Sequence, residues 1–308
     1  MNVTAPQSYD VVVAGSGIIG AACALALTQA GLRVALVERE FPGSGATAAG
    51  MGHIVVMDDS EAQFALTRRS QLLWQALSAV LPPGAEYETR GTLWIAADDD
   101  ELAEAERKQA YFNVREVPSR LLSIRELTAM EPNLRPGLAG ALLVPEDAVV
   151  YPPAVALHLA RQAQSLGATL LVGHAITHLA DGEARLDDGV RLRAPRLVNA
   201  TGAEASHCTA GLPVKKRKGH LAITDRYPGF VHHQLVEVGV GLHRIVRDVD
   251  AAEVIGYPAR PHVVELRLHR GVGRRRDDAE LHASAERITG HASSPGRQAT
   301  ALARSSDS

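Results

Sequence analysis

The sequence predicts an α/β fold with a parallel sheet in its N-terminal part and a second, mixed sheet further along. Three observations lead to this prediction. A short apolar strand, an Ala/Leu-rich helix and a second apolar strand follow one another within residues 10–38. A run with strand character at 91–96 lies between two helical patterns, and the apolar period changes to two after residue 169. Such alternation is typical of α/β chains with an interleaved second domain.

Composition narrows the class of protein. Of the 308 residues, 46% are hydrophobic and 22% are charged, which excludes a disordered chain. The net charge of −3 lacks the basic excess of a nucleic-acid-binding protein, so we expect no nucleic-acid partner. Cys23 and Cys208 form no disulfide or zinc pattern and favour a reducing, cytoplasmic location. No Lys or Arg precedes Arg33, so we expect the apolar run 11–27 to be neither a signal peptide nor an integral membrane segment.

The first motif is a Rossmann-like βαβ unit. Strand 10–14 leads into Gly15-Ser16-Gly17-Ile18-Ile19-Gly20, helix 21–30 ends at Gly31, and strand 32–37 ends at Glu38. Gly15 permits the tight turn, Gly17 lets the backbone approach a pyrophosphate, and Gly20 lets helix and strand pack closely. The helix N-terminus attracts phosphate, and Glu38 is placed to accept hydrogen bonds from a ribose. The motif predicts a dinucleotide but does not distinguish FAD from NAD.

Two further segments point to the same cofactor. The loop 41–52 consists of small residues and carries the hydroxyls of Ser44 and Thr47, which suit phosphate or flavin polar atoms; a flexible surface linker is the alternative. Strand 196–199 continues into Ala200, Thr201 and Gly202. Ligands of open α/β sheets lie at the carboxyl ends of strands, so these three residues could meet the same cofactor, although an ordinary strand end fits the spacing equally well.

The remaining helices and strands are predicted from helix-capping residues and from the spacing of apolar residues. Ser60 opens a helix that runs to about residue 80, residues 91–96 form a strand, and Asp98 caps a helix to about residue 111. We expect a short helix at 121–130 and a longer one from Pro152 to Gly167. Residues 169–193 then predict a small antiparallel meander, with turns at 181–182 and 187–189.

Taken in order, these pieces resemble the D-amino-acid oxidase family of FAD-dependent oxidoreductases, which includes glycine oxidase, sarcosine oxidase and the hydroxyproline and opine dehydrogenase subunits. The resemblance rests on residues 9–20 with Glu38, the loop 43–52, Gly91-Thr92-Leu93-Trp94-Ile95-Ala96 and Val198-Asn199-Ala200-Thr201-Gly202. Smaller similarities are Glu131-Pro132, Pro145 with Asp147, and Lys218-Gly219-His220 after Pro213. The resemblance to the family covers roughly residues 8–240.

The resemblance implies an FAD enzyme that oxidises the C–N bond of an amine or of an amino or imino acid, by hydride transfer from the substrate carbon to flavin N5. It implies a small-molecule substrate, an electron acceptor or partner subunit, and no catalytic metal; attachment at the inner membrane would be peripheral. The residues that it assigns to FAD are Gly15, Ser16, Gly17, Ile18, Ile19, Gly20, Glu38, Arg39, Ser44, Gly45, Ala46, Thr47, Ala49, Gly50, Met51, Ile176, Ala200, Thr201 and Gly202.

The resemblance also places His53 beneath the flavin ring, where a titrating imidazole would tune the charge of the flavin. A packed or hydrogen-bonded structural histidine is the alternative. The family's architecture predicts an FAD-binding domain from residues 1–80 and 146–212, and a partial substrate domain from residues 81–145 and 213–240.

The last 68 residues depart from the family. They carry 11 Arg, 9 acidic residues and no Lys, a charge of +2 against −5 for residues 1–240. We find there no counterpart of the family's glycine-rich strand–turn–helix or of its frequent substrate-carboxylate arginine. We therefore expect residues 241–308 to be a poorly ordered tail produced by a frameshift or truncation, with a divergent tail as the alternative. The other functions left open are an NAD(P)-linked dehydrogenase, an FAD monooxygenase, and a non-catalytic remnant.

Overall fold

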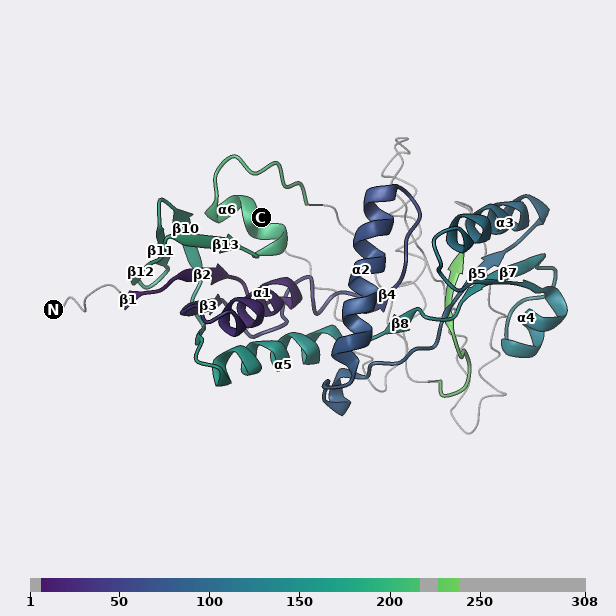
Figure 1. Ribbon diagram of the computed structural model, residues 1–308, viewed down its shortest axis with the longest axis horizontal. Coiled ribbons are helices and arrows are strands. Elements are labelled where there is room, and N and C mark those ends of the chain that lie inside the picture. Colours follow the sequence, from purple (N-terminus) through teal and green to yellow (C-terminus); the bar gives the residue numbers. More distant parts are fainter. Residues whose placement is uncertain (1–6, 217–226, 239–308) are drawn as a thin grey trace, which may run out of the picture. The chain divides into compact units, whose positions relative to one another are not determined.

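A parallel sheet forms the centre of the N-terminal part of the protein. The computed structural model describes residues 7–216 and 227–238, and Figure 1 shows their elements. Strands β2 (Val11–Ala14), β3 (Val34–Glu38), β9 (Thr169–Val172) and β13 (Arg196–Asn199) pair in the order β13-β2-β3-β9, all parallel. The predicted Rossmann-like unit is therefore present, with α1 (Ile18–Gln29) as its first crossover.

Both faces of this sheet are covered because its strands are apolar on both sides. Val11 and Val13 of β2 pack with α1 and α5 (Pro152–Ser165), whereas Val12 and Ala14 pack against a second sheet. That sheet has the order β1-β12-β11-β10, from β1 (Gln7–Ser8), β10 (Ile176–Ala180), β11 (Glu183–Leu186) and β12 (Arg191–Arg193). Alternate residues of a strand point to opposite faces, so a strand buried on both sides is apolar throughout.

The predicted meander needs one correction. Residues 169–180 do not form one strand, because β9 ends at Val172 and belongs to the parallel sheet, and β10 begins only at Ile176. Gly173, with φ +86°, lies at the break. The turns at 181–182 and 187–189 are confirmed, with positive φ at Asp181, Gly182 and Gly189.

The second sheet region is mixed, as predicted. It pairs β14 (Gln234–Glu237), β5 (Thr92–Ala96), β7 (Gly140–Val144) and β6 (Arg120–Ser123) in that order. β14 runs parallel to β5, and the other pairs are antiparallel. Helices α3 (Asp99–Asn113) and α4 (Ile124–Met130) lie against opposite faces of this sheet (Figure 1).

The structure confirms the two predicted helix caps, but one helix begins later than predicted. Ser60 accepts a hydrogen bond from the backbone N–H of Gln63 at the start of α2 (Glu61–Ser78), and Asp98 accepts one from Glu101 at the start of α3. The helix expected from residue 121 begins only at Ile124, because residues 120–123 form the edge strand β6 and Ser123 caps α4 through a full capping box.

Short elements complete the fold. They are the strand pair β4 (His53–Ile54) and β8 (Ala148–Val149), the 3₁₀ turns η1 (Pro83–Ala85) and η2 (Gly202–Glu204), and α6 (Ala205–Cys208). Within the described ranges, no helix is both long and apolar enough to span a membrane. The predicted tail 241–308 and Lys218-Gly219-His220 lie outside the described residues, and the division into two domains stays a prediction.

A buried carboxyl group ties several of these elements together. Asp147 is fully buried between β7 and β8, and its Oδ1 accepts hydrogen bonds from Val56 N at 3.3 Å and Gln71 Nε2 at 2.9 Å. Burial raises the pKa of Asp147 to about 7, although the hydrogen bonds that it accepts oppose this shift. The side chain therefore changes its protonation state near neutral pH.

We predict that Asp147 makes the stability of the protein fall as the pH rises. With a folded-state pKa of about 7 and an unfolded value near 3.8, the folded protein holds an extra proton between these limits. The stability that this extra proton contributes is largest below pH 4, decreases as the pH rises towards 7, and no longer changes above pH 7. Asp147→Asn removes it, so the free energy of unfolding relative to wild type should rise by on the order of 2 kcal/mol between pH 5 and pH 8.

Urea unfolding at both pH values checks this prediction. Asp100→Asn, at an exposed position in the first turn of α3, controls for the loss of a surface aspartate. Equal destabilisation by Asp147→Asn at pH 5 and pH 8 would show that this carboxyl group is ionised throughout.

Candidate functional site

The turn after β2 leaves no room for a side chain at Gly15 or at Gly20. Gly15 has φ +90°, and a Cβ there would lie 2.7 Å from the carbonyl oxygen of Ala200. A Cβ on Gly20 would lie 1.8 Å from the carbonyl oxygen of Gly15. Such distances require glycine, because backbone atoms cannot move aside without loss of the strand–helix contact. The roles predicted for these two glycines in turn geometry and close packing are therefore confirmed.

Glu38 connects the end of β3 to the same turn. Its side chain is buried, and its Oε2 accepts a hydrogen bond from Ser16 N at 2.7 Å. Its Oε1 accepts from Glu40 N at 2.9 Å and from the Ser44 hydroxyl at 3.3 Å. Since a carboxylate offers about four acceptor positions, one remains for an outside donor such as a ribose hydroxyl.

The loop 41–52 is anchored at both ends and folds over the N-terminus of α1. Gly43 N donates to Ser16 O at 2.8 Å, and Gly52 packs against Val150, where a Cβ would lie 1.9 Å from its carbonyl oxygen. In the middle, the Thr47 hydroxyl accepts a hydrogen bond from Ile18 N at 3.0 Å. These contacts fix the loop next to the glycine-rich turn, and the alternative of a free linker is wrong.

Polar groups at this helix end are left without partners. The Ser16 hydroxyl is buried without a hydrogen bond, and the N–H groups of Ile19 and Gly20 have no acceptor among the described residues. Helix N-termini bind anions through such N–H groups and through the helix dipole. Ile19, at this helix end, is 67% exposed, and Met51, in the loop 41–52, is 40% exposed. This donor set fits the diphosphate of a dinucleotide.

The carboxyl end of β13 lies against the turn, as its register with β2 requires. Asn199 pairs with Ala14, and Ala200 N donates to Ala14 O at 2.8 Å. Asn199 holds the following loop in place: its Oδ1 accepts from the Thr201 hydroxyl at 2.7 Å and its Nδ2 donates to Ala205 O at 2.8 Å. Ala200 and Thr201 therefore border Gly15, and their expected proximity is confirmed.

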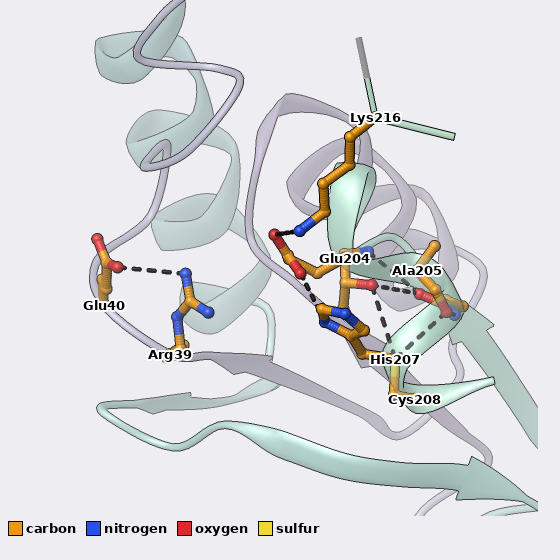
Figure 2. A network of polar contacts seen from close by, with 9 residues as sticks. Arg39, Glu40, Glu204, Ala205, His207, Cys208 and Lys216 are labelled. Carbon is orange, nitrogen blue, oxygen red and sulfur yellow. Dashed lines mark hydrogen bonds and ion pairs between the residues drawn. The ribbon is translucent and has the colours of Figure 1, made fainter. Parts of the chain in front are cut away.

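A charged network follows this loop. Figure 2 shows the Glu204 carboxylate between Lys216 and His207, each 2.6 Å from one of its oxygens. The Lys216 ammonium lowers the pKa of Glu204 through its hydrogen bond, and His207 and Arg39 lower it further by charge. Arg39 itself pairs with Glu40 at 3.3 Å and is largely exposed. The network ties Lys216 to the α6 region through Glu204, and the two carboxylates of Glu40 and Glu204 balance the charges of Arg39 and Lys216.

His53 lies on a different element. It forms the start of β4, pairs with Val149 of β8, and lines a pocket with Met57, Thr67 and Trp74 among others. Its side chain is exposed at one side, yet the surrounding protein desolvates the imidazole and lowers its pKa. A neutral imidazole at neutral pH follows.

The other predicted residues are less closely tied to the turn. Gly45, Ala46, Ala49 and Gly50 are exposed along the loop, Gly202 begins η2, and Ile176 begins β10, half-buried against the meander. Sequence patterns did not predict that Glu131 and Asp147 join distant segments, or that Asn199 holds the loop after β13. The signal was their position in motifs that resemble those of the family.

Comparisons with known proteins agree with this geometry. The model of the DAO family, described as FAD dependent oxidoreductase, matches residues 10–287. It therefore extends beyond residue 240, where we had expected the resemblance to end. The chain is 29% identical to hydrogen cyanide synthase subunit HcnC of Pseudomonas aeruginosa over 273 residues, 72% of this chain and 66% of that protein. It is 32% identical to glycine oxidase of Geobacillus kaustophilus over 170 residues, 53% of this chain and 45% of that protein.

Solved structures give the same result. Glycine oxidase from Geobacillus kaustophilus matches with a TM-score of 0.61 and 29% identity over 65% of this chain and 57% of that chain. L-proline dehydrogenase from P. horikoshii matches with a TM-score of 0.66 and 25% identity over 76% and 65%. The chain spans 66% or less of the length of these relatives. By sequence and by fold, the chain belongs to the DAO family of FAD-dependent oxidoreductases.

Proposed function

We propose that the protein oxidises the C–N bond of an amine or of an amino or imino acid, with FAD as the hydride acceptor. The observation that supports this most directly is the glycine turn with its unpaired Ser16 hydroxyl and free N–H groups, beneath a loop anchored by Thr47. Within this family that arrangement suits the FAD diphosphate. When bound, the flavin supplies the oxidising chemistry, and the protein binds and orients both partners.

The residues proposed to hold FAD divide by the part of the cofactor that they suit. The turn after β2 and the end of β13 are proposed to bind the diphosphate, through Gly15, Ser16, Gly17, Ile18, Ile19, Gly20, Ala200, Thr201 and Gly202. The adenosine half of FAD is proposed to contact Glu38, Arg39 and Ile176. The loop towards the flavin supplies Ser44, Gly45, Ala46, Thr47, Ala49, Gly50 and Met51.

His53 is proposed to border the flavin ring. Its lowered pKa keeps the imidazole neutral at neutral pH, so it would present a hydrogen-bonding group without a full charge. A neutral neighbour leaves the electron affinity of the flavin less dependent on pH than a histidine that titrates at its ordinary value.

The wider context is proposed from the relatives. Glycine oxidase and L-proline dehydrogenase are named for amino-acid substrates, and hydrogen cyanide synthase subunit HcnC is named as a subunit, which favours a partner subunit here. We propose an FAD-binding domain from residues 1–80 and 146–212, a substrate domain from 81–145 and 213–240, and a cytoplasmic location. The electron acceptor is a small molecule or a partner protein.

We predict that the purified protein is yellow and shows the visible absorption bands of oxidised flavin. Glycine or proline added without oxygen should bleach these bands, because the substrate reduces the flavin. A colourless protein that binds NAD(P)H would favour an NAD(P)-linked dehydrogenase, and a colourless protein that binds neither nucleotide would favour a non-catalytic remnant. Anaerobic spectrophotometry distinguishes the three results.

Gly17→Ala tests the diphosphate site separately from the fold. A Cβ at Gly17 would meet only the Thr47 hydroxyl, at 3.0 Å, so the apoprotein should fold, while the added methyl group blocks close approach of the diphosphate. We expect the affinity for FAD to fall at least tenfold, or about 1.4 kcal/mol. Gly84→Ala is the matched control, because its Cβ would meet nothing within 4 Å. Fluorescence titration of apoprotein with FAD measures both, and unchanged affinity in Gly17→Ala would contradict the assigned site.

A further inference from the structure

The pocket that His53 lines is built from two separate segments of the chain. It measures about 180 Å³; one wall comes from the segment 53–57, and the other comes from Thr67, Ser70 and Trp74 on α2. The first wall is paired to β8 through only two residues, at its start. The contacts between the segment 53–57 and α2 therefore decide whether this pocket stays closed.

Two polar contacts join these walls. The Met57 N–H donates to the Thr67 hydroxyl at 3.1 Å. The Val56 N–H and the side-chain amide of Gln71 both donate to one oxygen of Asp147, Oδ1, at 3.3 Å and 2.9 Å. Gln71 lies on α2 and is fully buried. One carboxyl oxygen is therefore the shared acceptor for both walls of the pocket.

The surroundings of Asp147 do little to stabilise a negative charge. Its second oxygen, Oδ2, is buried without a hydrogen-bond partner among the described residues. The adjacent Glu146 is acidic, and it pairs at 2.8 Å with Arg68 of α2, which also donates to Gln71 Oε1 at 2.6 Å. β5 contributes the uncharged hydroxyl of Thr92, and the segment after β4 contributes only a backbone N–H. Burial and, to a smaller extent, the charge of Glu146 raise the pKa of Asp147 to about 7.

We propose that Asp147 is a positioning residue that acts as a proton-dependent latch between the segment 53–57 and α2, and so controls the opening of the pocket beside His53. When protonated, Asp147 accepts both donors without placing a charge in the interior. When ionised, it carries a buried charge whose second oxygen lacks a donor, and separation of the two walls lets water reach that oxygen. The inference rests on the proposed function only for the place of this pocket beside the flavin.

The effect of pH on the latch has a definite sign. The pKa of Asp147 is about 7 in the closed latch and returns towards 3.8 once water reaches the carboxyl group. Opening therefore releases a proton between these values, so it becomes easier as the pH rises towards 7 and does not change further above pH 7. His53 acts in the opposite direction, because burial lowers its pKa and its protonation favours opening as the pH falls. The direction of the change distinguishes the two groups.

Hydrogen–deuterium exchange of the full chain between pH 5 and pH 8 tests the latch. The protection factor, which corrects for the intrinsic effect of pH on exchange, should fall at least tenfold between pH 5 and pH 7 for the amides of Val56 and Met57, and then level off. Both amides should exchange faster than that of Val12 in β2, because the latch opens without unfolding of the parallel sheet.

Three variants identify the titrating group. Asp147→Asn cannot ionise, so the protection of Val56 and Met57 should not change with pH. Glu146→Gln removes a charge that raises the pKa of Asp147, so the levelling-off should move to lower pH. This variant decides the question if Asp147→Asn does not fold. Asp100→Asn, at an exposed position of α3, is the matched control and should follow wild type.

Several results would overturn the inference. They are a protection factor of Val56 that is constant or rises with pH in wild type, exchange of Val56 no faster than that of Val12, and the wild-type pH course in Asp147→Asn or, where that variant does not fold, in Glu146→Gln. A protein that binds no FAD would contradict the proposed function and leave this test unaffected, because exchange is measured on the chain itself.

Discussion

The close contact between the glycine turn and the end of β13 is the constraint on which the rest of the site depends. Gly15 approaches the carbonyl oxygen of Ala200 so nearly that a Cβ would lie 2.7 Å from it, and Gly20 approaches Gly15 more closely still. This packing sets the direction of α1 and therefore the direction of its free N–H groups. It also requires that β2 and β13 be neighbours, which their parallel register provides.

Glu38 shows how a buried negative charge and an anion site coexist at one helix end. A carboxylate beside a helix N-terminus competes with a phosphate for the same donors and repels it. Here Glu38 takes Ser16 N, Glu40 N and the Ser44 hydroxyl, and Thr47 takes Ile18 N. The N–H groups of Ile19 and Gly20, in the first turn of α1, are left without an acceptor among the described residues. The carboxylate of Glu38 and the free N–H groups of the helix end therefore have separate sets of partners.

The sequence allowed the elements with local signals to be predicted and failed where the decisive partner is distant. Ser60 and Asp98 cap helices through bonds to residues three positions on, so spacing alone reveals them. By contrast, β14 exists because Gln234–Glu237 pairs in parallel with β5, more than 130 residues earlier. The break at Gly173 is invisible in the period of two, because the strands on both sides are apolar.

Three buried carboxyl groups supply these distant ties, and each acts through backbone N–H groups of another segment. Glu38 holds the turn at Ser16, Asp147 holds Val56, and Glu131 holds His232 and His233. A buried carboxyl group without such partners would destabilise the fold by several kcal/mol, so each one specifies a single arrangement of the segments that it joins. Gly91 connects two of these segments through its backbone: its N–H donates to the carbonyl of Asp147 at 2.9 Å, and its carbonyl accepts from Gln234 N at 3.1 Å. The backbone around Gly91 therefore joins the chain at Asp147 to the start of β14, which follows the two histidines that Glu131 holds.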